Sequence, residues 1–171
     1  MSSVFSKIRG GGARPPAASS RQVLNGLIGG GLAISIIAAI TRSYHVPLLM
    51  APLGASCFLI FAVPDVPFAQ PRNVVFGHLL SSLVGLIFVN YVGVGPIEMG
   101  VAVGIASALM LYTRTSHPPA GADPLVVMIA AGKLGWSFLA TPVLVSTVIL
   151  VLVALLVNNV GKDKAWPKYW F

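Results

Sequence analysis

Charged residues are scarce in this chain of 171 residues, since 9% of them are Asp, Glu, Lys or Arg while 56% are hydrophobic. A soluble domain of average composition carries roughly a quarter charged residues. The mean hydropathy of +0.89 agrees with that deficit. The composition therefore excludes an ordinary soluble domain and predicts an integral membrane protein whose main partner is the lipid bilayer.

Residues that carry chemistry are also few. The single cysteine, Cys57, lies in an apolar run, cannot form a disulfide within the chain and has no neighbouring base that would make it a nucleophile. Three scattered histidines do not have metal-ligand spacing, and the HExxH, GxSxG and phosphate-loop motifs are missing from the sequence. We therefore expect no enzymatic activity, no metal and no cofactor.

Basic residues, which give the chain a net charge of +7, gather at its two ends. Basic ends around a hydrophobic body follow the positive-inside rule, so we expect both termini in the cytoplasm, an even number of crossings and no nucleic-acid partner. The expected location is the bacterial inner (plasma) membrane. An organelle membrane is the alternative, because residues 1–21 are basic, serine-rich and free of acids, as transit peptides are.

The apolar sequence is bounded by two polar regions. Residues 1–21 are predicted to be a disordered, basic cytoplasmic tail. Residues 22–158 are predicted to form a single transmembrane domain with halves at residues 22–94 and 97–158. Residues 159–171 form a basic and aromatic C-terminal tail, suited to the membrane surface.

The most polar interruption of the apolar sequence lies at residues 113–124. Pro118 and Pro119 lack N–H donors and disfavour helical angles in the residues before them, so a helix arriving from residue 112 should end here. Gly121 permits a left-handed turn or the close approach of another group, and Asp123 is placed to cap the next helix. The pattern predicts a broken helix, in which a polar break precedes a short helix with a free N-terminus.

Two short patterns occur once in each half. Residues 41–45 and 113–117 share T-R-x-x-H, and residues 52–56 and 119–123 share P-x-G-A followed by a candidate capping residue. Each half therefore consists of a span, a break, a short helix, a loop and a span. Paired interrupted segments of this kind mark the midplane site of many transporters.

The fold class predicted from this pattern is an all-α membrane protein, a helical bundle of two weakly similar halves that each contain a broken or short helix. The short segments could be full crossings, giving six segments, or re-entrant hairpins, giving four spans plus two hairpins. The distribution of basic residues between the loops favours six.

Small residues recur at helical spacing in two places. Gly26 and Gly30 form a GxxxG pair, and Gly100, Gly104 and Ala108 follow one another every four residues. Such stripes allow close helix packing in membranes, so we interpret them as packing surfaces and keep a homo-oligomer as a candidate assembly.

A polar break at membrane depth must line a protein-filled or watery cavity. The N-termini of the two short helices would direct N–H groups into it and favour an anion, with basic side chains adding to the same field. His78 shares a helix face with Ser81 and Ser82, and an ionisable group inside a span is seldom idle. The candidate substrate-binding residues are Gly54, Ala55, Ser56, Arg72, Asn73, His78, Arg114, His117, Pro118, Pro119, Gly121, Ala122 and Asp123.

Asp123 is the difficult member of this set. A carboxylate beside an anion site repels the anion unless it is protonated, paired with Arg114 or His117, or used for proton coupling.

The string HPPAGA at residues 117–122 resembles the signature of the HPP family of integral membrane proteins. Residues 51–56 (APLGAS), 69–73 (AQPRN) and 77–81 (GHLLS) are similar to further parts of its pattern, in the family's order, so the resemblance covers about residues 47–157. The family is usually described with four transmembrane helices, and its plant and cyanobacterial members are associated with nitrite transport. The resemblance thus implies a transporter or channel for a small inorganic anion, with nitrite as the leading substrate. A non-transporting membrane scaffold or subunit and a neutral-solute channel remain as alternatives.

Overall fold

A computed structural model describes residues 12–130, 134–161 and 165–171 of the chain. In these ranges the protein is helical and contains no strand, so the predicted all-α fold class is confirmed. The α-helices are α2 (Ser20–Tyr44), α3 (Pro52–Cys57), α4 (Pro71–Ile87), α5 (Pro96–Tyr112), α6 (Asp123–Ile129) and α7 (Val145–Asn158). Short π-helical segments are η1 (Phe58–Ala62), η3 (Phe88–Val92) and η6 (Ala140–Leu144), and short 3₁₀ segments are η2 (Pro67–Ala69), η4 (Pro118–Ala122) and η5 (Trp136–Leu139).

Three helical stretches of the described chain are long and apolar enough to cross a membrane: Ser20–Tyr44, Pro71–Val92 and Trp136–Asn158. Pro52–Ala62 and Pro96–Tyr112 are shorter apolar helices. Helices α3 and α6 are the short helices that the two-half pattern predicts, whereas α5, which the pattern predicts as a span, falls among the shorter apolar helices.

The start of α2 is set by a capping box, in which Ser19 accepts a hydrogen bond from the N–H of Gln22 while the Gln22 side chain accepts one from the N–H of Ser19. The helix therefore begins at Ser20, two residues before the predicted start of the membrane domain. It ends at Tyr44, and the C-cap residue His45 has a left-handed backbone (φ 54°). Residues 1–11, part of the predicted disordered tail, lie outside the described residues.

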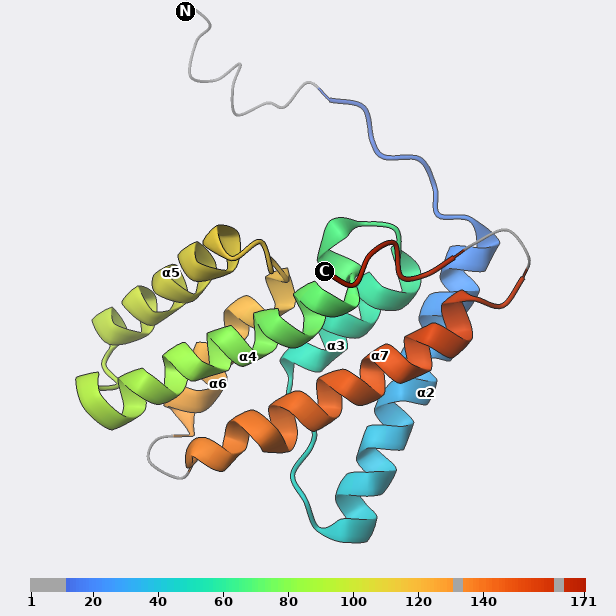
Figure 1. Cartoon of the computed structure of the whole chain (residues 1–171). Coiled ribbons are helices and arrows are strands. Elements are labelled where there is room, and N and C mark those ends of the chain that lie inside the picture. The colour runs from blue at the N-terminus through green and yellow to red at the C-terminus, as the bar shows by residue number, and fades with distance from the viewer. Residues whose placement is uncertain (1–11, 131–133, 162–164) are drawn as a thin grey trace, which may run out of the picture.

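The first short segment returns along α2. A Cβ atom on Gly30 would lie 3.6 Å from Cβ of Cys57, and one on Gly26 would lie 3.5 Å from Cβ of Ala62. Residue numbers rise along one segment as they fall along the other, so the two run antiparallel, and this glycine pair is a packing surface as predicted. Residues 63–66 then lie beside the N-terminal turn of α2, with which they line one cavity. The chain has crossed the bundle from one end to the other (Figure 1).

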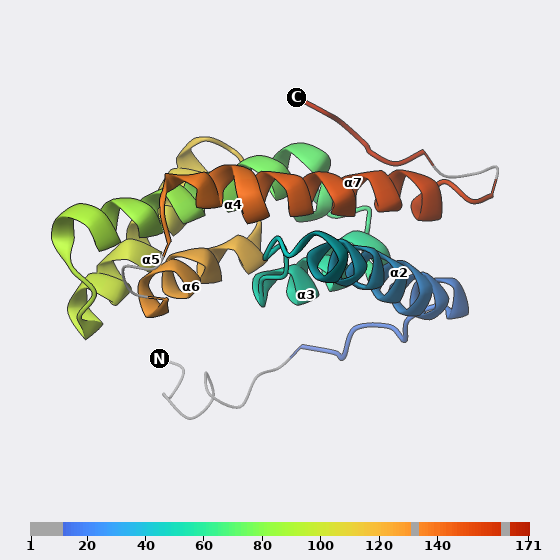
Figure 2. The ribbon, with the colours of Figure 1, turned by 90° about the horizontal axis from the view of Figure 1, so that it is seen from below.

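The second short segment crosses in the opposite direction. It starts where Asn73 at the beginning of α4 donates to the carbonyl of Ser116. It then follows α4, since a Cβ atom on Gly85 would lie 2.8 Å from Cα of Pro124. A re-entrant hairpin would return to the end at which it began, and neither short segment does so. The six-segment interpretation therefore describes this arrangement, and the two halves have opposite orientations (Figures 1 and 2).

Helix α4 lies at the centre of the bundle and packs against α5, α6 and α7. Gly77 and Gly85 allow its neighbours to approach closely. A Cβ atom on Gly77 would lie 2.8 Å from Cβ of His117 and 2.9 Å from the carbonyl oxygen of Thr115. Only glycine leaves enough room at these two positions. They bring residues 113–124, which we call the broken segment, against α4.

The glycine stripe of α5 contacts nothing within the described chain. Gly100, Gly104 and Ala108 are exposed, and a Cβ atom on either glycine would meet no atom within 4 Å. The interpretation as a packing surface is therefore wrong for contacts inside this part of the chain. Side chains on the opposite face of the helix, Ala102 and Ala106, are fully buried and carry its packing.

The C-terminal residues 165–171 pack back onto the start of α4. Trp166 is buried, and the N–H of Lys168 donates to the side-chain oxygen of Gln70 (2.7 Å). The hydroxyl of Tyr169 donates to the side-chain oxygen of Asn73 (3.1 Å). The described parts of both terminal regions thus lie at the same end of the bundle, near the start of α4.

A candidate functional site where the two short helices meet

Four polar side chains meet in the interior of the bundle. Ser56 comes from α3, His78 from α4, His117 from the residue before η4 and Asp123 from the first turn of α6, and all four have relative exposures of 0%. Burying ionisable groups without partners is expensive, so their hydrogen bonds must account for their positions.

The four side chains form one hydrogen-bonded chain. Oδ2 of Asp123 lies 2.7 Å from Nδ1 of His78, and Nε2 of His78 lies 2.8 Å from Oγ of Ser56. The same Oγ lies 2.8 Å from Nε2 of His117, whose Nδ1 is 2.6 Å from the carbonyl oxygen of Phe68. The two imidazole rings are 5.0 Å apart, centre to centre. We call Ser56, His78, His117 and Asp123 the buried cluster.

Two further serines on the same face of α4 hold the broken segment. Ser81 donates to the carbonyl of Ala120 (2.6 Å), and Ser82 donates to Oδ2 of Asp123 (3.2 Å). The other carboxylate oxygen, Oδ1 of Asp123, has no hydrogen-bond partner among the described residues. The polar face predicted for this helix from His78, Ser81 and Ser82 therefore points at the second half of the molecule.

The start of α4 fixes the chain that leads into the cluster. Arg72 donates to the carbonyl of Thr113 (3.0 Å), and Asn73 donates to that of Ser116 (2.9 Å). Arg114, between these anchors, has a left-handed backbone (φ 56°) and an exposed side chain. Of the two predicted arginines, Arg72 contacts the broken segment, whereas Arg114 neither pairs with Asp123 nor reaches the cluster.

The predicted capping roles are wrong. Helix α3 begins at Pro52, so Ser56 lies in its body, where Oγ is 3.2 Å from the carbonyl of Pro52, and Gly54 already donates its N–H to Ala51. Neither α3 nor α6 has a side-chain hydrogen bond at its N-cap, because Asp123 turns toward His78 instead. Of the residues predicted to present free N–H groups, Ser56 and Asp123 instead make side-chain hydrogen bonds across the bundle.

Gly121 does not adopt a left-handed turn. It lies inside η4 with φ outside the positive range, and a Cβ atom there would meet nothing within 4 Å. The small residues of the two P-x-G-A elements lie on the outer side of the cluster. Gly54, Ala55, Pro118 and Ala122 are exposed, and Pro119 and Gly121 are half-buried.

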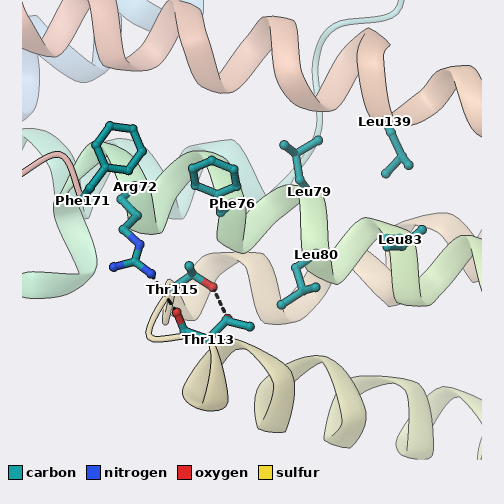
Figure 3. A pocket seen from close by; sticks show the side chains of 9 residues that line it. All are labelled: Arg72, Phe76, Leu79, Leu80, Leu83, Thr113, Thr115, Leu139 and Phe171. Atoms are coloured by element: carbon teal, nitrogen blue, oxygen red, sulfur yellow. Dashed lines mark hydrogen bonds between the residues drawn. The ribbon is translucent and has the colours of Figure 1, made fainter.

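A groove of about 540 Å³ opens beside the start of the broken segment (Figure 3). Arg72 points toward Thr113 and Thr115 at its polar end, where the two threonine hydroxyls are 2.8 Å apart. The remaining lining is apolar and consists of Phe76, Leu79, Leu80, Leu83, Leu139 and Phe171.

Several contacts of the cluster have no signal in the sequence. Ser56 meets His78 across 22 positions and His117 across 61, and no spacing rule pairs residues so far apart. The matched elements of the two halves indicate that the short helices meet, but not which side chains touch. No group of three or more His, Cys, Asp or Glu side chains that could hold a metal occurs in the part of the chain described.

Six apolar segments in alternating directions, with ionisable side chains buried where the two halves meet, define a polytopic helical membrane protein. The chain belongs to the HPP transmembrane family, whose model, described as "HPP, transmembrane region", matches residues 15–167. The resemblance carried by residues 117–122 is confirmed at the level of the family.

Two curated relatives, both described as transmembrane proteins of Dictyostelium discoideum, are similar to this chain. One is 35% identical over 132 residues, covering 72% of this chain and 46% of the relative. The other is 30% identical over 179 residues, covering 98% of this chain and 57% of the relative. The chain thus spans about half the length of the curated relatives it matches, and no solved structure matches it.

Proposed function

We propose that the protein is a membrane transporter or channel for a small inorganic anion, with nitrite as the first candidate. The observation that carries the proposal is the buried cluster at the junction of two oppositely oriented halves. Binding sites of secondary transporters lie at such junctions, beside interrupted helices. Ionisable residues buried inside a membrane domain mark solute or proton pathways by default.

The polar groups around the cluster suit an anion more than a cation. Hydroxyls of Ser56, Ser81 and Ser82 and two imidazole rings can donate hydrogen bonds, while the acid of the cluster, Asp123, is engaged by His78 at 2.7 Å. Arg72, Thr113 and Thr115 at the polar end of the groove would attract an anion. This end is close to the cluster along the chain, because Thr113 is four residues before His117. Nitrite as the specific substrate rests on the family resemblance.

The fully buried state of the cluster corresponds in this proposal to a closed state of the pathway. The hydrogen bond between Ser56 and His117 joins α3 to the residue before η4, so separation of these two segments would open a route to the cluster. Glycines on the outer side of both, Gly54 and Gly121, have open space where a side chain would lie, which leaves room for such a movement.

Orientation and assembly are parts of the same proposal. We place the end of the bundle that carries both termini in the cytoplasm, following the positive-inside rule. Ser137 lies near the start of the helical stretch Trp136–Asn158, and Val160 lies two residues after its end. Impermeant thiol reagents applied to intact cells should then label Ser137→Cys but not Val160→Cys.

We also assign the exposed stripe of α5 to contact with a second copy, since small-residue stripes associate helices in lipid.

A specific observation favours a second candidate. Ser56, His78 and Asp123 are connected as in a serine hydrolase, with hydroxyl, imidazole and carboxylate in sequence at 2.8 and 2.7 Å. The Ser56 hydroxyl, however, has no exposed surface and is shared with a second histidine, so we keep the prediction that the protein is not an enzyme. Covalent labelling of Ser56 by a fluorophosphonate would contradict that prediction.

The deciding experiment is uptake of nitrite, nitrate, formate and chloride by liposomes that contain only this protein. Ser56→Ala should reduce uptake by about fivefold to a hundredfold, since leaving a buried polar group without its hydrogen-bond partner costs about 1–3 kcal/mol. Ser107→Ala is the matched control, because Ser107 also donates to a carbonyl four residues earlier but lies on α5, away from the cluster.

The alternatives give different results in the same liposomes. Wild-type protein that moves none of the four anions would indicate a scaffold or subunit. Water or neutral-solute flux without anion flux would indicate a neutral-solute channel.

A further inference from the structure

The hydrogen positions in the buried cluster can be deduced from its contacts. A carbonyl oxygen only accepts hydrogen bonds, so the 2.6 Å contact to Phe68 requires that Nδ1 of His117 carries a hydrogen. In a neutral ring the other nitrogen, Nε2, is then an acceptor, and the 2.8 Å contact requires the hydroxyl of Ser56 to donate to it.

Ser56 has one hydrogen but two nitrogens at hydrogen-bond distance. Nε2 of His78 and Nε2 of His117 both lie 2.8 Å from its oxygen, and the carbonyl of Pro52 is a third acceptor at 3.2 Å. If both nitrogens were bare, two lone pairs would face one hydrogen, and one buried contact would join two acceptors. At least one of the two Nε2 atoms must therefore carry a hydrogen and donate it to Ser56.

The consequence reaches Asp123 whichever ring carries that hydrogen. If Nε2 of His78 is protonated, Nδ1 of His78 either accepts a hydrogen from a protonated Asp123 or carries a second one beside an ionised Asp123. If Nε2 of His117 is protonated, that ring is an imidazolium, and His78 donates to an ionised Asp123. Each arrangement contains one proton more than an ionised acid with two neutral histidines, so the cluster has no net charge.

We propose that the buried cluster is a proton-binding relay, which holds one excess proton and passes it between the Asp123–His78 pair and His117 through the Ser56 hydroxyl. In the transfer, the N–H bond at Nε2 of His78 breaks as an O–H bond forms at Ser56, and the original O–H bond of Ser56 breaks as an N–H bond forms at Nε2 of His117. The hydroxyl then donates to His78. One proton has moved, no other reactant is needed, and every contact remains a donor–acceptor pair.

Other ionisable groups do not take part in this chain of contacts. On the elements packed around His78 and on the neighbouring helix α3, the remaining ionisable side chains of the described residues are Cys57, Arg72, Tyr91, Glu98 and Tyr112. None of them hydrogen-bonds to a member of the cluster, and Arg72 donates to the carbonyl of Thr113 instead. The relay therefore has two ends, Asp123 and His117, which belong to the same broken segment. His117 contacts Ser56 directly, and Asp123 is connected to it through His78.

A neutral resting charge also removes the difficulty of an acid next to an anion pathway. Asp123 does not repel an anion when the cluster as a whole carries no charge, and a proton moved to His117 turns the ring beside the start of the broken segment positive. The relay is deduced from hydrogen-bond geometry alone, so failure of the anion-uptake experiment would leave it standing.

Nitrogen-15 NMR of ring-labelled histidine in lipid nanodiscs tests the proton count. The chain has three histidines, and His45→Gln leaves only His78 and His117 to be observed. The nitrogen shifts distinguish an imidazolium from the two neutral tautomers. We expect protonated Nδ1 in His117 and, near neutral pH, a hydrogen on Nε2 of at least one ring. Two neutral rings with bare Nε2 atoms would overturn the proposal.

The role of Ser56 is tested in the same labelled background. In the parent protein both rings should respond together as pH changes, since they share one proton, and Ser56→Ala should make their responses independent. Ser56→Thr keeps the hydroxyl and should restore the joint response, and Ser107→Ala should not alter it. Joint titration that survives Ser56→Ala would refute the relay. If Ser56→Ala does not fold, the proton count and the Ser56→Thr spectrum, which must match the parent's, still decide.

Discussion

Gly77→Ala is the sharpest test of how the site is held together. The added Cβ would lie 2.8 Å from Cβ of His117 and 2.9 Å from the carbonyl oxygen of Thr115. The first neighbour is the root of a fully buried side chain and the second is backbone, so neither can move without shifting the broken segment. Overpacking of this kind costs about 1–3 kcal/mol.

The matched control is Gly100→Ala on α5, where an added Cβ meets no atom within 4 Å. Both substitutions gain about the same helix propensity, about 1 kcal/mol. The difference between the two variants therefore isolates the clash at His117. We expect Gly77→Ala to be less stable than Gly100→Ala by about 1–3 kcal/mol.

Unfolding by denaturant in a defined detergent measures the difference, and nitrite uptake measures its effect on the site. Displacing His117 lengthens its contacts to Ser56 and Phe68, so uptake should fall together with stability. Equal stability of Gly77→Ala and Gly100→Ala would show that the broken segment does not rest against α4 as described. Full stability with lost uptake would place the effect in function alone and refute the packing argument.

Three further predictions concern the cluster and the helix surfaces. His78→Gln and Asp123→Asn should each flatten the pH dependence of anion uptake, because each removes a group that holds the shared proton; an unchanged pH profile in liposomes would assign that residue to structure. Gly104→Ile should abolish self-association of the protein, measured by native mass spectrometry from nanodiscs, since it fills an exposed small-residue stripe; an unchanged oligomer would remove α5 from the interface. Gly121→Ala should leave thermal unfolding within about 0.5 kcal/mol of the parent, because the added methyl group meets open space; a large loss would show an unseen contact.

The architecture could be predicted from local rules. Pro118 and Pro119 break the chain because proline cannot continue a helix from the preceding turn, and the matched P-x-G-A elements indicate that the short helices correspond. Helical spacing predicts that His78 shares a polar helix face with Ser81 and Ser82, and all three side chains make buried hydrogen bonds. These inferences use neighbours in sequence, which is why they hold.

The capping predictions, and the packing of the α5 stripe inside the described chain, failed where the answer depends on distant parts of the chain. Asp123 could satisfy the N-terminus of α6, but His78 is 45 positions away and offers a stronger partner in the interior. The P-x-G-A pattern predicts Ser56 at a helix start, whereas α3 begins four residues earlier at Pro52. The α5 stripe has the spacing of a packing surface, and only the assembled bundle shows that it faces outward.

Asn73 connects the surface of the molecule to its interior through a single amide. Its oxygen accepts the hydroxyl of Tyr169, and its nitrogen donates to Ser116, one residue before His117. A protein or lipid that displaces residues 165–171 would free this amide to rotate and would loosen the anchor of the segment that carries His117. An affinity tag or fluorescent protein fused after Phe171 would act on the same bond, so functional assays are better served by a fusion at the other end of the chain.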